Sequence, residues 1–90
     1  MALIVLDVRT PAEFGGGHLR GATNLDFHDP GFRHRLGLLN RNDAYVVYCN
    51  GGSRAGRTRD LMECLGFIDV ASYSIHGAGV ATGLPVVTPD

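Results

Sequence analysis

An apolar run that ends in a cysteine, followed at once by glycines and arginines, constrains this chain more than any other feature. The run from Ala44 to Cys49 has the length of a buried strand. Four later positions repeat at the spacing of one helix face: Thr58, Leu61, Met62 and Leu65. The sequence therefore predicts a strand, a tight turn and a helix that begins at Ser53 or Arg54 and ends at Gly66. Cys49 would lie at the corner between strand and helix.

This corner is suited to an anion. Ligands of an open parallel sheet bind at the carboxyl ends of its strands, and the amides of a glycine turn and of a first helical turn have no partners within the helix. We expect these amides, together with Arg54, to stabilise a thiolate at Cys49. The sequence thus predicts a nucleophilic sulfur in a loop that binds anions.

Other short segments accompany the cysteine loop. Residues 6–14 read Leu-Asp-Val-Arg-Thr-Pro-Ala-Glu-Phe, in which Thr10, Pro11 and Glu13 form the capping-box pattern of a helix start. Residues 17–25 read Gly-His-Leu-Arg-Gly-Ala-Thr-Asn-Leu, and residues 83–86 read Gly-Leu-Pro-Val. Four residues separate Cys49 from Arg54. In this order, the segments resemble the rhodanese (sulfurtransferase) domain over nearly the whole chain.

The resemblance implies an α/β fold: a small three-layer domain with a mostly parallel four- to five-stranded sheet flanked by helices. We expect a single domain over residues 1–90 that is shorter than the family pattern at the N-terminus and before the C-terminal turn. The second shortening would expose one flank of the core, which a partner or a second copy could cover.

The same resemblance implies a sulfurtransferase. Sulfane sulfur would pass from thiosulfate or a similar donor to cyanide or a thiol through a persulfide on Cys49, and a protein could also accept it. The implied substrate-binding residues are Asn50, Gly51, Gly52, Ser53, Arg54 and Ala55. Asp7 and Arg9 would support the site, with Asp7 mainly a buried hydrogen-bonding anchor. Arg57 and Arg59 would extend the basic approach, although at least one of them covers the helix surface.

Two other functions remain open. A cysteine phosphatase or arsenate reductase also surrounds a cysteine with amides and an arginine, but with a longer loop, and the short loop here favours a sulfur atom over a tetrahedral phosphate. A non-catalytic rhodanese-like module could instead bind a partner or carry sulfur to it. His18 could serve as a base for Cys49, but a structural role near the loop between the first strands is favoured.

Composition and charge limit the classes of partner and cofactor that the sequence favours. The 90 residues carry a net charge of −1 with interspersed signs, which favours neither nucleic acid nor membrane. The apolar start is too short for a membrane span. Two cysteines make no disulfide framework, so we expect reduced thiols in a cytoplasmic protein, with Cys64 buried and inert. The spacing of histidines and cysteines predicts no metal site, and no cofactor is expected.

The remaining elements follow from local patterns. A buried strand is expected over Leu3–Val8 and a short second strand over Ala22–Phe27. A loop or helical turn should run through Phe32, Leu36 and Leu39, and the segment from Phe67 to Ile75 should supply a turn and the last strand. Residues 76–79 are expected to form a loop near the same sheet edge.

Overall fold

A parallel sheet lies at the centre of the protein. The computed structural model describes residues 2–89. Four strands build the sheet: β1 (Leu3–Asp7), β3 (Thr23–Asn24), β4 (Ala44–Cys49) and β5 (Asp69–Ser74). Their order is β3-β1-β4-β5, and every neighbouring pair is parallel. The expected α/β fold is therefore confirmed, with four strands.

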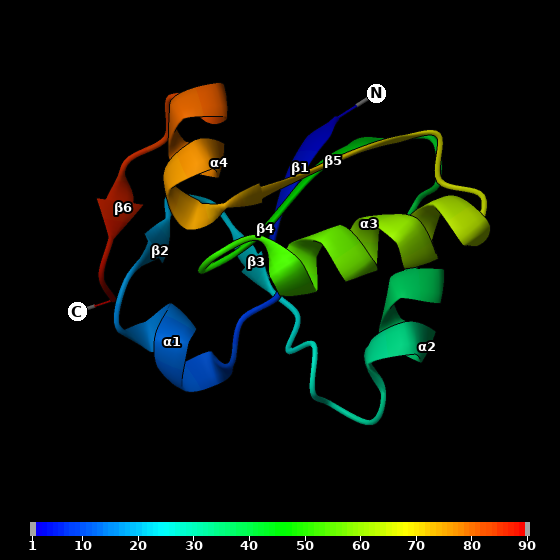
Figure 1. Ribbon diagram of the computed structural model, residues 1–90, viewed down its shortest axis with the longest axis horizontal. Coiled ribbons are helices and arrows are strands. Elements are labelled where there is room, and N and C mark those ends of the chain that lie inside the picture. The colour runs from blue at the N-terminus through cyan, green and yellow to red at the C-terminus, as the bar shows by residue number, and fades with distance from the viewer. Residues whose placement is uncertain (1, 90) are drawn as a thin grey trace.

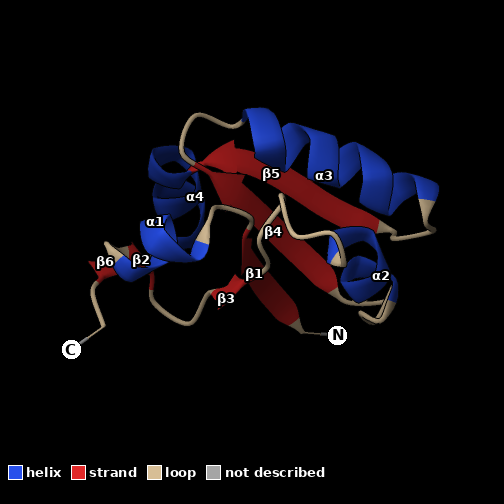
Figure 2. Ribbon diagram, turned by 90° about the horizontal axis from the view of Figure 1, so that it is seen from below, coloured by secondary structure: helices blue, strands red, loops and turns tan. Residues whose placement is uncertain are grey.

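Helices cover both faces of this sheet (Figures 1 and 2). The helices are α1 (Pro11–Gly15), α2 (Phe32–Gly37), α3 (Ser53–Cys64) and α4 (Ile75–Thr82). Helices α2 and α3 lie on one face, and α4 lies on the other. Two further strands, β2 (His18–Leu19) and β6 (Val86–Val87), form a separate antiparallel pair beside α4. These layers are what the sequence led us to expect.

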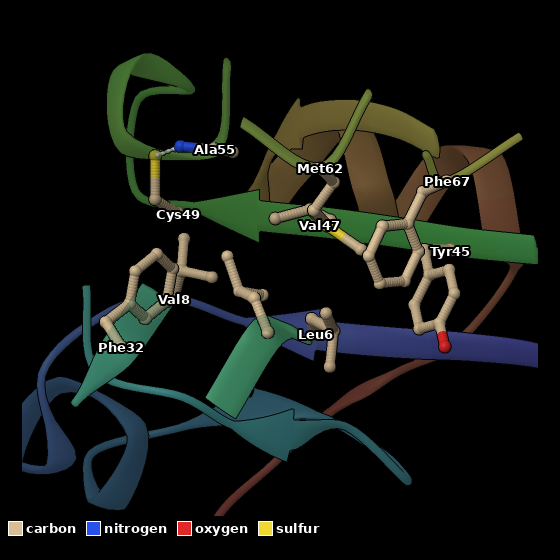
Figure 3. Packing of buried hydrophobic residues seen from close by; sticks show 10 residues of the cluster. Leu6, Val8, Phe32, Tyr45, Val47, Cys49, Ala55, Met62 and Phe67 are labelled. Atoms are coloured by element: carbon tan, nitrogen blue, oxygen red, sulfur yellow. Dashed lines mark hydrogen bonds between the residues drawn. The ribbon is translucent and has the colours of Figure 1, made fainter. Parts of the chain in front are cut away.

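The central strand β4 divides the core into two clusters because successive side chains of a strand point to opposite faces. Tyr45, Val47 and Cys49 pack with residues of α2 and α3. Met62 of α3 and Phe67, which follows this helix, belong to the same cluster (Figure 3). On the other face, Val46 and Tyr48 pack with residues of β1, β2 and α4: Val5, Leu19 and Ala78. Because β4 is covered on both sides, its last residue is held in a fixed direction.

Local chemistry sets the helix boundaries. Thr10 and Glu13 form the predicted capping box at the start of α1, with the Glu13 amide donating to Thr10 Oγ1 at 3.2 Å and Glu13 Oε1 accepting from the Thr10 amide at 2.9 Å. Helix α3 starts at Ser53, as predicted, and the chain turns at Gly66, whose φ of 96° suits a glycine after a helix end.

The segment 76–79 was expected to be a loop, and this expectation is wrong. It belongs to α4, because the Ser74 hydroxyl caps the helix by accepting the Gly77 amide at 3.0 Å. The helix ends at Gly83, which has a φ of 73°. Val80 on this helix is 74% exposed.

Two other expectations need correction. The second strand, expected over Ala22–Phe27, pairs with β1 only at Thr23 and Asn24 and is therefore much shorter. The β2–β6 pair was not predicted. Cys64 was expected to be buried, but it is exposed near the end of α3. The helix turns Met62 toward the core, and a residue two positions later points elsewhere.

Candidate active site

Cys49 is the last residue of β4, and its sulfur accepts two backbone hydrogen bonds. The Gly52 amide donates to Cys49 Sγ at 3.0 Å. The Ala55 amide donates to the same atom at 3.3 Å (Figure 3). These donors come from the turn and from the first helical turn of α3, where amides have no partners within the helix. The cysteine is only 1% exposed. The arrangement stabilises negative charge on a largely enclosed sulfur atom.

Gly52 allows the turn to bring its amide to the sulfur. It is the N-cap residue of α3 and has a φ of 101°, a backbone conformation that residues with a Cβ atom rarely adopt. Gly51, beside it, is not among the glycines with positive φ, and a Cβ atom built there would meet nothing within 4 Å. The backbone conformation of the turn therefore favours glycine at position 52 but not at position 51.

Gly52→Ala is expected to destabilise the protein by about 1–2 kcal/mol, because alanine resists the left-handed region. Gly51→Ala is the matched control and should change the unfolding free energy by less than about 0.5 kcal/mol. Chemical denaturation followed by circular dichroism measures both. Equal losses in the two variants would show that the backbone of Gly52 is not the constraint.

Arg54 lies in the first turn of α3 and forms an ion pair with Glu13 of α1. Arg54 Nη1 donates to Glu13 Oε1 at 2.8 Å, and Nη2 donates to Oε2 at 3.1 Å. Both side chains are partly buried, with 23% and 29% of their surfaces exposed. The ion pair therefore joins α1 to the cysteine loop.

The carboxylate of Glu13 is bound from two sides. The hydrogen bond from Arg54, together with the Thr10 amide, lowers the pKa of Glu13 to about 2. The same hydrogen bond raises the pKa of Arg54. Because the Glu13 pKa is lowered, the pair contributes stability above the ordinary carboxyl pKa and loses it as the pH falls toward 2. From the sequence, Glu13 was expected only in the capping box, and its contact with the loop was not predicted.

Asp7 and Arg9 form a second, buried ion pair at the end of β1. Arg9 Nη2 donates to Asp7 Oδ2 at 2.8 Å and Nε donates to Oδ1 at 3.0 Å. Both residues are buried, and the Arg9 guanidinium lies 5.6 Å from the centre of the Tyr48 ring. The hydrogen bond to Asp7 raises the pKa of Arg9. Asp7 is thus the buried hydrogen-bonding anchor that was expected.

This buried pair also contacts the segments around the cysteine loop. Arg9 Nη1 lies 3.5 Å from Asn50 Oδ1, and Arg9 Nη2 donates to the Gly17 carbonyl oxygen at 2.5 Å. His18 lies next in the chain, with its Nδ1 atom 2.9 Å from the Phe14 carbonyl oxygen and its ring stacked on that of Phe14. His18 therefore has the structural position that was expected.

The other residues assigned to the site are distributed around the loop. Asn50, Gly51 and Ser53 are exposed, and Ser53 begins α3. Arg57 is also exposed, whereas Arg59 donates to Ser72 Oγ at 3.0 Å and to the carboxylate of Asp60, so that it covers the surface between α3 and β5. Within residues 2–89, no group of three or more His, Cys, Asp or Glu side chains could hold a metal ion.

A parallel strand that ends in a cysteine, with the next helix donating amides to the sulfur, defines a small α/β domain with a sulfur-centred site. A family model described as the rhodanese-like domain matches residues 1–76. The chain therefore belongs to the rhodanese-like domain family, as its sequence motifs indicated.

Several curated proteins and solved structures are similar to this chain. Thiosulfate sulfurtransferase PspE of Escherichia coli is 29% identical and its match covers 72% of this chain, and a thiosulfate sulfurtransferase of Corynebacterium glutamicum is 36% identical over 98% of it. A tRNA uridine(34) hydroxylase of Listeria welshimeri is 35% identical over 88% of this chain. The structure of a rhodanese with anions from E. coli aligns with a TM-score of 0.78 and 25% identity, covering 98% of this chain and all of that one.

The matches cover only part of each curated relative. They include 62% of the E. coli sulfurtransferase, 39% of the C. glutamicum protein and 25% of the tRNA hydroxylase.

Among the helices of residues 2–89, none combines the length and the apolar character that crossing a membrane requires.

Proposed function

We propose that this protein is a sulfurtransferase that moves sulfane sulfur through a persulfide on Cys49. The observation that carries the proposal is the pair of amide donors on Cys49 Sγ, from Gly52 at 3.0 Å and Ala55 at 3.3 Å. The names of two relatives, both thiosulfate sulfurtransferases, support thiosulfate as the donor. A small thiol or cyanide is the proposed acceptor, and a protein thiol could take its place.

The reaction divides into two transfers. The Cys49 thiolate attacks the outer sulfur of thiosulfate, the S–S bond of the donor breaks, and sulfite leaves with the bonding electron pair. Cys49 then carries the outer sulfur as a persulfide. In the second transfer, cyanide attacks this outer sulfur, thiocyanate leaves, and the electron pair of the broken S–S bond restores the Cys49 thiolate.

The amide donors serve both transfers. They hold negative charge on the sulfur before the attack, and they receive it again when the acceptor removes the outer sulfur. Their positions are set by the backbone, so they need no rearrangement during the reaction. Asn50, Gly51 and Ser53 contribute further to the loop that would surround the outer sulfur of the persulfide.

The mass of the intact protein tests this proposal. In a Cys64→Ser variant Cys49 is the sole cysteine, and incubation with thiosulfate is expected to add about 32 Da, the mass of one sulfur atom. Cyanide should remove this mass and release an equivalent amount of thiocyanate. A sample that is folded by circular dichroism yet gains no sulfur would contradict the proposal and favour a binding module.

A further inference from the structure

Two arginines beside the cysteine loop, Arg54 and Arg9, are each paired with a carboxylate. Arg54 uses two guanidinium nitrogens to bind both oxygens of Glu13, and Arg9 is bound in the same way by Asp7. Arg54 was assigned to the residues that bind the sulfur donor. Its positive charge is already balanced by a carboxylate within 2.8 Å.

We propose that Glu13 is a specificity-determining residue that lowers the affinity of the Cys49 loop for dianionic sulfur donors and favours donors with less negative charge. The proposal rests on the proposed sulfurtransferase function. A monoanionic thiosulfonate is one example of the favoured class, and thiosulfate, with two negative charges, is an example of the disfavoured one.

The Glu13–Arg54 ion pair makes the binding of a dianion costly. A dianion that approaches Arg54 must either displace Glu13 from both guanidinium nitrogens or bind next to its carboxylate. The first costs the hydrogen bonds at 2.8 and 3.1 Å, and the second places like charges close together in a partly buried site. The second cost grows with the negative charge of the donor. The Glu13 carboxylate is ionised throughout the neutral range, and its lowered pKa extends this to more acidic pH.

Glu13 is also held in place independently of any ligand. Its Oε1 atom accepts hydrogen bonds from the Thr10 amide at 2.9 Å and from Thr10 Oγ1 at 3.1 Å. The capping box therefore fixes the carboxylate beside Arg54, and moving it away would also disturb the start of α1. A donor that needs Arg54 for itself must overcome both sets of contacts.

Glu13→Gln separates charge from geometry. Glutamine keeps a side-chain oxygen that can accept from Thr10 and from Arg54, but it carries no charge. We expect the KM for thiosulfate to fall by about three- to tenfold, and the KM for methanethiosulfonate, a monoanion, to fall less. Glu63→Gln is the matched control, because Glu63 is exposed near the opposite end of α3 and its loss changes the net charge equally. An unchanged or higher KM for thiosulfate in Glu13→Gln would overturn the proposal.

Alkylation of Cys49 gives a second measurement that needs no sulfur transfer. In the Cys64→Ser background, the ratio of the rate constants for iodoacetate, an anion, and iodoacetamide, which is neutral, reports the charge around Cys49. Glu13→Gln should raise this ratio about three- to tenfold, and added salt should reduce the difference. An unchanged ratio would overturn the role of Glu13. A raised ratio in a protein that accepts no sulfur would contradict the sulfurtransferase function and keep the charge effect of Glu13.

Discussion

Cys49→Ser is expected to abolish persulfide formation and to lower the rate of sulfur transfer by about a thousandfold or more. A serine hydroxyl cannot hold the transferred sulfur as a persulfide, and at neutral pH it is a far weaker nucleophile than a thiolate. Its oxygen can still accept hydrogen bonds from the Gly52 and Ala55 amides, which now donate to the cysteine sulfur. The variant should therefore keep the fold while losing the reaction.

Thiocyanate production from thiosulfate and cyanide measures the loss, and thermal unfolding by circular dichroism tests whether the fold is kept. Cys64→Ser is the matched control, because it makes the same chemical change at an exposed position near the far end of α3. Its activity should stay close to that of the parent protein. Substantial sulfur transfer by Cys49→Ser would show that another group carries the sulfur.

Asp7→Asn is expected to cost about 3–5 kcal/mol of unfolding free energy. The substitution leaves the Arg9 guanidinium without its carboxylate in a site where the two side chains are 6% and 0% exposed. An unpaired buried charge is more costly than either the intact pair or an uncharged replacement of both partners. Because Arg9 also contacts Asn50 and the Gly17 carbonyl, the damage should extend to the cysteine loop.

Chemical denaturation measures this loss, with Asp60→Asn as its matched control. Asp60 also pairs with an arginine, Arg59, at 3.0 Å, but the two side chains are 68% and 40% exposed. Solvent screens such a pair, and its loss should cost less than about 1 kcal/mol. Similar losses in the two variants would mean that the burial of Asp7 and Arg9 does not determine the strength of their interaction.

Much of the central architecture could be predicted because local signals agree there. The apolar run of β4, the glycine turn and the helical spacing after it all specify one strand-turn-helix unit, and the structure contains it with nearly the predicted bounds. The capping box at Thr10 was equally local. Where several neighbouring residues favour the same element, local preference and tertiary packing agree, so the element can be predicted from the sequence.

Elements that depend on distant contacts were missed. Helix α4 contains Gly77 and Gly79, which are poor helix formers, and it is stabilised by its Ser74 cap and by the burial of Ala78 against the sheet. The β2–β6 pair joins two-residue strands that lie far apart in the sequence. Neither segment has a hydrophobic periodicity in its sequence from which a helix or a strand could be predicted.

The candidate site likewise has one part that local sequence signals predicted and one part that they missed. The amides around Cys49 follow from the glycine turn and could be expected, whereas the Glu13–Arg54 pair joins residues 41 positions apart. The capping box already accounted for Glu13, so no signal remained to indicate a second partner. The burial of Cys64 was misjudged from its apolar neighbour, although the direction of a helical side chain depends on its place around the axis.

The parallel pairing of β1 with β4 also bears on how the site is assembled during folding. Leu3 is paired with Ala44 and Asp7 with Tyr48, so this pairing requires the long intervening segment to be closed into a loop. Sheets with such distant pairings fold more slowly than helical bundles of similar size. We therefore expect a partly folded chain, in which this pairing has not yet formed, to expose Cys49 more than the folded protein does, where this residue is 1% exposed.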